Sequence, residues 1–143
     1  MEINTQSSLK FLGVNILSVQ FHSQKPFHHG EKIPVSLEID PTAFFPSLRP
    51  NDFTILMDVK VEAAGFFELH LVASSEFETD ETLEEETRKN FVNANALAIM
   101  FPYIRAFIAS FTANLGDRFD SLSLPPQSFH GEVPVGEDEP VEN

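Results

Sequence analysis

The chain has 143 residues and a formal net charge of −13, with nine Lys and Arg against 22 Asp and Glu. This length is typical of one domain, and a hydrophobic content of 42% with 15 Phe excludes a disordered chain. Because the nine basic residues are scattered, with only Arg88 and Lys89 adjacent, the sequence also excludes the cationic surface that a nucleic-acid-binding protein needs.

Two strands are expected in the first forty residues. Leu9–Phe21 is rich in β-branched and aromatic residues, and Gly13 stands where a bulge would change which side chains face inward. From Ile33 to Asp40 apolar and polar residues alternate, which is typical of a strand with one buried face. Pro34 places this second strand at a sheet edge or near a strand start.

A loop is expected next, over residues 41–52. It holds three prolines around Phe44, Phe45 and Leu48. It is too rigid for a helix and too apolar for an ordinary solvated connection. We therefore expect these aromatic rings to be covered.

A hairpin follows, over residues 53–78. Apolar and polar residues alternate in both halves, and Ala64 and Gly65 between them are typical of a tight turn. The acidic run over residues 76–86 then separates the strands from the rest, and is expected to be a solvated crossover or a short helix.

The last expected element is a helix from Phe91 to Leu115 that has no polar face. Between Ala94 and Leu115 its only full charge is Arg105, whereas a surface helix normally carries a charged stripe. Pro102 removes one helical hydrogen bond and should bend the axis.

This helix must be covered on nearly all sides. It is about as long as a membrane span, but a charge at its middle is costly in a bilayer, so insertion is not expected. The remaining explanation is burial against protein. Since a chain of this size has little of its own to surround the helix, we expect a homo-oligomer.

Strands followed by a helix predict an α+β domain over residues 1–131. We expect one four-stranded antiparallel sheet with the long, apolar, Pro-kinked helix on one face. After the helix, residues 119–129 are extended and stiffened by proline. Residues 132–143 form an acidic tail, for which we expect disorder.

The helix and the segment after it resemble the SecB family of export chaperones. The words that carry the resemblance are IMFPYIRAFIASFTANLG, which begins at Ile99, and SLSLPPQSF, which ends at Phe129. The matching positions are Phe101, Pro102, Tyr103, Arg105, Ile108, Ser110, Leu122, Leu124, Pro126 and Phe129. Upstream, from about residue 8, the agreement is one of architecture.

The resemblance implies both an assembly and a function. SecB-like chains form a dimer of dimers in which these helices lie between two outward-facing sheets. They act as ATP-independent holdases that bind unfolded or precursor polypeptides, either for export or for a dedicated client such as the antitoxin of a toxin–antitoxin pair. No cofactor and no catalytic residue is implied. The alternative is a SecB-like oligomeric interaction protein that has lost its client groove.

The chain departs from the family in two places. In export-type members a second helix follows the segment that ends here at Phe129, but His-Gly-Glu-Val-Pro follows instead, so we expect that helix to be absent. The family also presents acidic residues on the exposed sheet face to the ATPase SecA. Here Ser18, His22 and His70 stand at three such positions, and Glu68 stands near a fourth. These departures put SecA in question as a partner.

Two sets of residues are expected to carry the function. The client-binding set is Phe27, Phe44, Phe45, Leu48, Leu122, Leu124 and Phe129. The oligomer-interface set is Phe101, Tyr103, Arg105, Phe107, Ile108 and Phe111, in which the lone cation is expected to pair across the interface. For the loop around Phe44, packing on its own sheet is the alternative to client binding, and exposed apolar area separates the two.

No enzyme or metal site is expected. The adjacent His28 and His29 cannot both point inward without a special turn, and no second ligand cluster follows them. Neither a nucleophile elbow nor a Gly-rich phosphate loop occurs. Without Cys there is no thiol catalyst, and the start MEINTQSSLK lacks an export signal, so we expect the cytoplasm.

Overall fold

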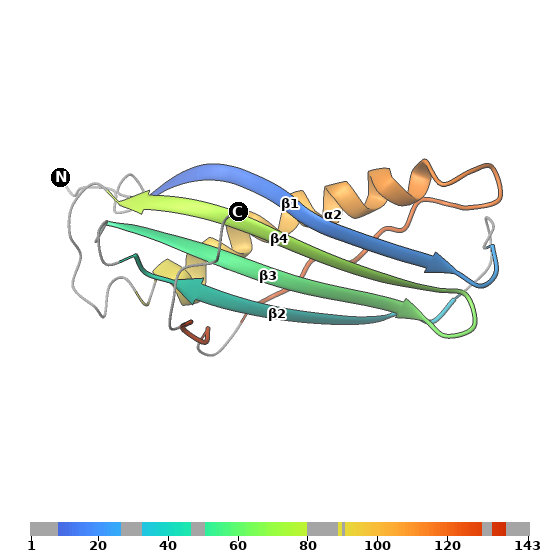
Figure 1. The fold of residues 1–143 in the computed structure, drawn as a ribbon, viewed down its shortest axis with the longest axis horizontal. Helices are drawn as coiled ribbons and strands as arrows, with labels where there is room; N and C mark the ends of the chain where they lie inside the picture. Colours follow the sequence, from blue (N-terminus) through green and yellow to red (C-terminus); the bar gives the residue numbers. More distant parts are fainter. Residues whose placement is uncertain are drawn as a thin grey trace.

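A computed structural model describes residues 9–26, 33–46, 51–79, 89, 91–129 and 133–136. Four strands form one antiparallel sheet in the order β1-β4-β3-β2. They are β1 (Leu9–Ser23), β2 (Ser36–Phe44), β3 (Asp52–Ala63) and β4 (Phe67–Thr79). A π-helical segment, η2 (Phe91–Ala96), then continues into the helix α2 (Leu97–Ala113), which lies on one face of the sheet (Figure 1). The predicted α+β class is confirmed.

β1 is irregular near the predicted bulge. Its register with β4 shifts between Phe11 and Val14, and again between Ile16 and Ser18. Gly13 lies in the first shift with a φ of +100°, a conformation that glycine adopts without steric cost. The buried hydroxyl of Ser75 donates a hydrogen bond to the Gly13 carbonyl at 2.7 Å, which satisfies it.

β2 runs further than the sequence analysis predicted. The expected loop began at Pro41, but the strand continues through Pro41, opposite Met57, and ends at Phe44. Proline is tolerated there because β2 is an edge strand, so that only one of its sides must supply ladder hydrogen bonds. The prediction of a loop from residue 41 to 44 was therefore wrong, although the edge position was right.

The core lies between the inner face of the sheet and one stripe of α2. The stripe repeats every three or four residues, as a core-facing helix requires, and consists of Leu97, Met100, Phe101, Ile104, Ile108 and Thr112. In the sheet, Phe53 and Phe77 stack with ring centroids 5.1 Å apart and are fully buried. The helix therefore has one core face of its own, despite its uniform composition.

The opposite face of α2 is exposed but carries no charge. Its exposed residues are small or uncharged: Ala98, Pro102, Tyr103, Ala106, Ser110 and Ala113. Tyr103 is the largest of them and is 55% exposed. Across the part of the chain that the structure describes, no helix is long and apolar enough to cross a membrane.

Residues 116–129 run back along α2, and we call them the return segment (Figure 1). The Leu122 N–H donates to Thr112 Oγ1 at 2.7 Å, and Arg105 Nε donates to the Leu124 carbonyl at 2.9 Å. The ring of Phe129 meets that of Phe101 edge-on, with centroids 5.8 Å apart. Ser121 Oγ also donates to the Ala109 carbonyl at 2.9 Å, so the return segment is fixed to the helix at several points along its length.

Four residues of the predicted acidic tail lie against β2. The Ala43 N–H donates to the Pro134 carbonyl at 2.9 Å, and the Gly136 N–H donates to the Ala43 carbonyl at 2.8 Å, which makes a parallel bridge between Ala43 and Val135. Val133 is only 9% exposed. These four residues are ordered, whereas the sequence predicted disorder, because backbone pairing and the burial of Val133 offset the entropy of ordering them. The remainder of 132–143 lies outside the described residues.

We expect Ile108→Ala to destabilise the fold by roughly 2–5 kcal/mol, because it leaves a cavity where α2 meets the sheet. Ser110→Ala, on the exposed face of the same helix, should change stability by less than about 0.5 kcal/mol. Urea unfolding followed by circular dichroism measures both. Equal stability of the two variants would contradict the assignment of the buried stripe.

Candidate functional site

An apolar groove runs along the inner side of β2, and we call it the β2 groove. It consists of two hollows. The first, of 340 Å³, is lined chiefly by Leu37, Ile39, Pro41, Leu97, Gln127 and Phe129. The second, of 270 Å³, is lined chiefly by Ala43, Phe45, Lys89, Val92 and Asn93. Val133 and Pro134 line both hollows, so the docked tail residues lie between them.

The β2 groove exists because α2 crosses the sheet at an angle. The helical segment begins behind β2, passes behind the sheet, and ends beyond its β1 edge (Figure 1). Two ring contacts join α2 to β1. Phe111, near the end of the helix, meets Phe21 with ring centroids 5.8 Å apart, and Tyr103, in the middle of the helix, meets Phe11 with ring centroids 5.2 Å apart. The inner face of β2 is therefore covered only by the start of the helical segment, the return segment and Val133–Gly136.

Alternation along β2 places apolar side chains in this groove. Leu37, Ile39 and Ala43 are paired with the inward residues of β3, so they point to the same side of the sheet. Leu37 and Ile39 are only half-buried, whereas Ala43 is fully buried. The strand is also an edge, so backbone groups on its outer side border the apolar surface.

The two hollows of the groove differ in polarity: the one beside Phe45 is mostly apolar, whereas the one beside Phe129 also exposes polar surface, with Gln127 and Ser128 among its lining residues. Lys89 is the one charged side chain among the described residues that line the groove. The Asn93 side chain is engaged, because its Oδ1 accepts the Val133 N–H at 2.8 Å. Such a surface suits an extended apolar peptide, which would gain from burial and from backbone pairing.

Two of the predicted client-binding residues line the groove. Phe45 lies at one end and also packs against Phe53, with ring centroids 5.9 Å apart, and Phe129 lies at the other. Phe44 points to the opposite face of the sheet, since it pairs with the outward residue Thr54. Phe45 therefore packs on its own sheet, as one alternative for the loop predicted, and it also borders the groove, while client binding by it stays a prediction.

The other predicted client-binding residues lie elsewhere. Leu124 is 4% exposed and belongs to the core, so it has no surface for a client. Leu122 is half-buried and does not line the groove. Phe27 and Leu48 lie outside the described residues. Sequence reasoning missed Leu37, Ile39, Val92 and Leu97 as site residues, because their apolar pattern is also that of an ordinary core.

The predicted interface residues divide in the same way. Tyr103, Arg105, Phe107 and Phe111 retain exposed surface on α2. Phe101 and Ile108 are 2% and 0% exposed within the single chain. These two therefore pack on the chain's own sheet and have no surface for direct contact with a second chain. The guanidinium of Arg105 is held by the Leu124 carbonyl of the same chain.

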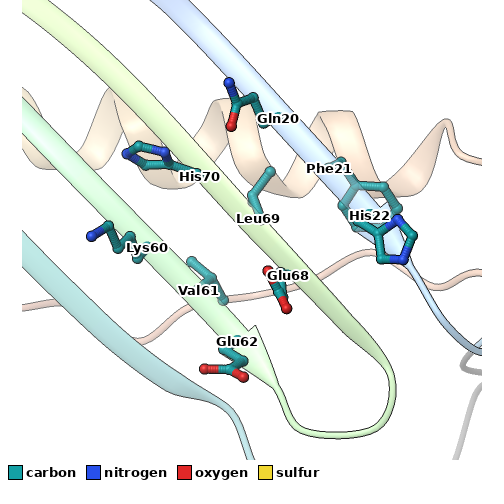
Figure 2. A pocket seen from close by; sticks show the side chains of 9 residues that line it. All are labelled: Gln20, Phe21, His22, Lys60, Val61, Glu62, Glu68, Leu69 and His70. Atoms are coloured by element: carbon teal, nitrogen blue, oxygen red, sulfur yellow. The ribbon is translucent and has the colours of Figure 1, made fainter.

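The outer face of the sheet carries a separate, polar hollow of 420 Å³. Figure 2 shows Gln20, His22, Lys60, Glu62, Glu68 and His70 around it. The ring of His70 lies 2.7 Å, Nε2 to Oδ1, from the carboxylate of Asp58. Ser18, His22, Glu68 and His70 thus occupy the exposed sheet face as the resemblance implied, but the face mixes both signs of charge.

No metal centre is found in the described part of the chain. Among those residues no three His, Cys, Asp or Glu side chains are arranged to hold an ion. His28 and His29, the pair considered in the sequence, lie outside the described residues.

Comparison with known proteins finds a relative by sequence and a similar solved structure. No protein-family model matches the chain. The chain is 30% identical over 136 residues to the uncharacterized protein MJ0357 of Methanocaldococcus jannaschii, with 92% of this chain and 86% of that protein covered. Its fold matches the SecB-like chaperone Rv1957 of Mycobacterium tuberculosis, solved in complex with a ChAD peptide from the Rv1956 HigA1 antitoxin. The TM-score is 0.66 at 16% identity, over 86% of this chain and 90% of that one. The fold is therefore SecB-like.

We expect Thr112→Val to loosen the return segment, which forms one wall of the groove. The hydroxyl of Thr112 accepts the Leu122 N–H and donates to the Ile108 carbonyl at 2.8 Å, and valine does neither. An unsatisfied Leu122 N–H should cost roughly 1–3 kcal/mol.

Hydrogen exchange of the Leu122 amide measures the loss of protection directly. Thr54→Val, a change of the same kind on the outer sheet face, is the matched control. Unchanged protection of Leu122 in Thr112→Val would show that the return segment is held by other contacts.

Proposed function

This chain belongs to the same family as the protein MJ0357 of Methanocaldococcus jannaschii, and from its SecB-like fold and open groove we propose that it is an ATP-independent holdase. It binds unfolded polypeptides in the β2 groove. The observation that carries the proposal is the groove itself, a pair of hollows lined largely by apolar side chains beside an edge strand, in a fold shared with a peptide-bound chaperone.

The physics of binding requires no nucleotide and no catalytic group. Apolar side chains of an unfolded chain lose contact with water in the groove, which favours binding by about 25 cal/mol per Å² buried. Edge backbone of β2 offers hydrogen bonds that do not depend on the client's sequence. Selectivity is then for exposed hydrophobicity, the property that distinguishes unfolded from folded proteins.

A dedicated client, such as a segment of an antitoxin, is the client class that we propose first. The similar structure holds a peptide from an antitoxin, and the β2 groove is sized for a short extended segment. Delivery of precursors to SecA is the second candidate. It has less support, because the outer sheet face carries Lys60, His22 and His70 beside its acidic residues.

We propose that the protein is a homo-oligomer that packs through the exposed face of α2, as in a dimer of dimers. That face carries small side chains and Tyr103 with no charge apart from the engaged Arg105, so it permits close approach of a second helix. The competing function is an oligomeric interaction protein that binds no client. Aggregation assays separate the two.

We expect the purified protein to suppress aggregation of a reduced, unfolded model protein at near-stoichiometric ratio. The double substitution Leu37→Ser/Ile39→Ser should weaken binding of that client about tenfold or more, because burying each aliphatic side chain contributes roughly 1.5–3 kcal/mol and part of this is recovered elsewhere.

The matched control is Leu56→Ser/Val72→Ser, which removes two half-exposed aliphatic side chains from the outer sheet face. It should bind the client as the wild type does, while thermal unfolding reports the folding of both variants. Wild-type protein that neither binds the client nor delays its aggregation would refute the holdase function and favour the interaction protein.

We expect Ala106→Asp to dissociate the oligomer without unfolding the chain. Ala106 is exposed on the helix face that we propose as the interface, and an unpaired carboxylate buried there would be strongly unfavourable. Sedimentation velocity should show the loss of the larger species, and Thr54→Asp on the outer sheet face should show none. A wild type that sediments as a monomer at micromolar concentration would end this proposal.

A further inference from the structure

Val133–Gly136 occupies the place that a client strand would take in the β2 groove. We propose that this stretch is a built-in competitor: an unfolded polypeptide binds by strand addition to β2 and displaces it. The inference rests on the holdase proposal and names how the client is held and what limits its access. It predicts that the groove accepts an extended apolar segment running parallel to β2.

The backbone contacts of the docked stretch are those of an added strand. Ala43 donates its N–H to Pro134 and accepts the N–H of Gly136, at 2.9 and 2.8 Å. Ala43 therefore turns both backbone groups away from β3 and toward the docked stretch. By alternation Leu37 and Ile39 turn theirs in the same direction, and no strand in the described part of the chain pairs with them on that side.

The docked stretch cannot continue along that open edge. Its carbonyl at Pro134 points toward β2, so the nitrogen of the same residue does too, and proline has no N–H to donate. Among the described residues, pairing of this stretch with β2 consists of the two bonds to Ala43. A client strand without proline at this position can donate its N–H to the Pro41 carbonyl, a hydrogen bond that the chain's own segment cannot make. Pro41 itself has no N–H to donate, so pairing beyond it resumes only at Ile39 and Leu37.

The side chains show a partial fit. Val133 is 9% exposed and lines both hollows, whereas Val135 is 56% exposed and fills little of the groove. Gly136 passes the ring of Phe44 so closely that a Cβ atom would overlap it. From these contacts we expect the ligand to be an extended segment that places an apolar side chain at the centre of the groove and a small residue beside Phe44.

Charge keeps this self-contact weak. The docked residues are uncharged, but residues 132–143 carry five acids and no base in a chain of net charge −13. Repulsion between the tail and the rest of the chain opposes docking, while burial of Val133 favours it. A weak contact is what a displaceable segment requires, because a client must overcome it to bind.

The test compares two full-length variants with equal charge. Val133→Asp should undock the stretch, whereas Val141→Asp adds the same charge to the same tail beyond it. Fluorescence anisotropy measures binding of labelled, reduced and carboxymethylated α-lactalbumin, a permanently unfolded chain. We expect Val133→Asp to bind about three- to tenfold more tightly than Val141→Asp, because the apparent affinity is reduced by the fraction of groove that the tail occupies.

Gly136→Ala supplies a second way to undock the stretch, through the overlap with Phe44, and thermal unfolding reports the folding of each variant. Hydrogen exchange gives the direct readout on the wild type. Saturation with the client should expose the Gly136 amide, while the Ala43 amide stays protected because the client strand replaces the Pro134 acceptor.

Equal affinities of Val133→Asp, Gly136→Ala and Val141→Asp, or a Gly136 amide that stays protected at saturation, would overturn the competitor and leave the holdase function standing. If neither the wild type nor any variant binds the unfolded chain, the holdase function fails and the competitor fails with it. The two failures are therefore distinct.

Discussion

A single helix packs on the inner face of a four-stranded sheet, and the arrangement of the rest of the molecule follows from that contact. The stripe from Leu97 to Thr112 fills the space over β3, β4 and β1, where aromatic pairs such as Phe21 and Phe111 close the core. Because the helix crosses the sheet at an angle, only the start of the helical segment covers the inner side of β2 (Figure 1). The groove and the uncharged outer face of α2 are the two surfaces that this packing leaves over.

These two surfaces have different physical requirements. The outer face of α2 is continuous along the helix and built of small side chains, so it suits a permanent contact with a second copy. The β2 groove is narrow and borders an edge strand, so it suits a transient contact with an extended chain. The chain's own Val133–Gly136 partly covers this edge, which limits the strand edge and the apolar surface that stay open beside it.

Sequence patterns predicted the fold well where one residue type decides the structure. Alternation placed β3 and β4, Gly13 marked the irregularity in β1, and the long apolar helix was evident. The path of β2 through Pro41 was missed, because an edge position can tolerate proline and the sequence does not show how far an edge extends. The docking of Val133–Gly136 was missed because it depends on a pairing across the fold.

The site was predicted less completely. Phe45 and Phe129 were chosen for their aromatic character and do line the groove, whereas Leu124 and Ile108, equally apolar, are buried in the core. Apolar character alone cannot separate these cases, since exposure depends on the angle at which α2 crosses the sheet.

The most direct measurement of client binding in the β2 groove is photo-crosslinking with p-benzoylphenylalanine at Phe129, in the groove, and at Phe66, beside the turn between β3 and β4. If clients bind in the β2 groove, an unfolded polypeptide should crosslink to position 129 and not to position 66. Crosslinks from position 66 alone, or from neither position, would contradict client binding in the groove.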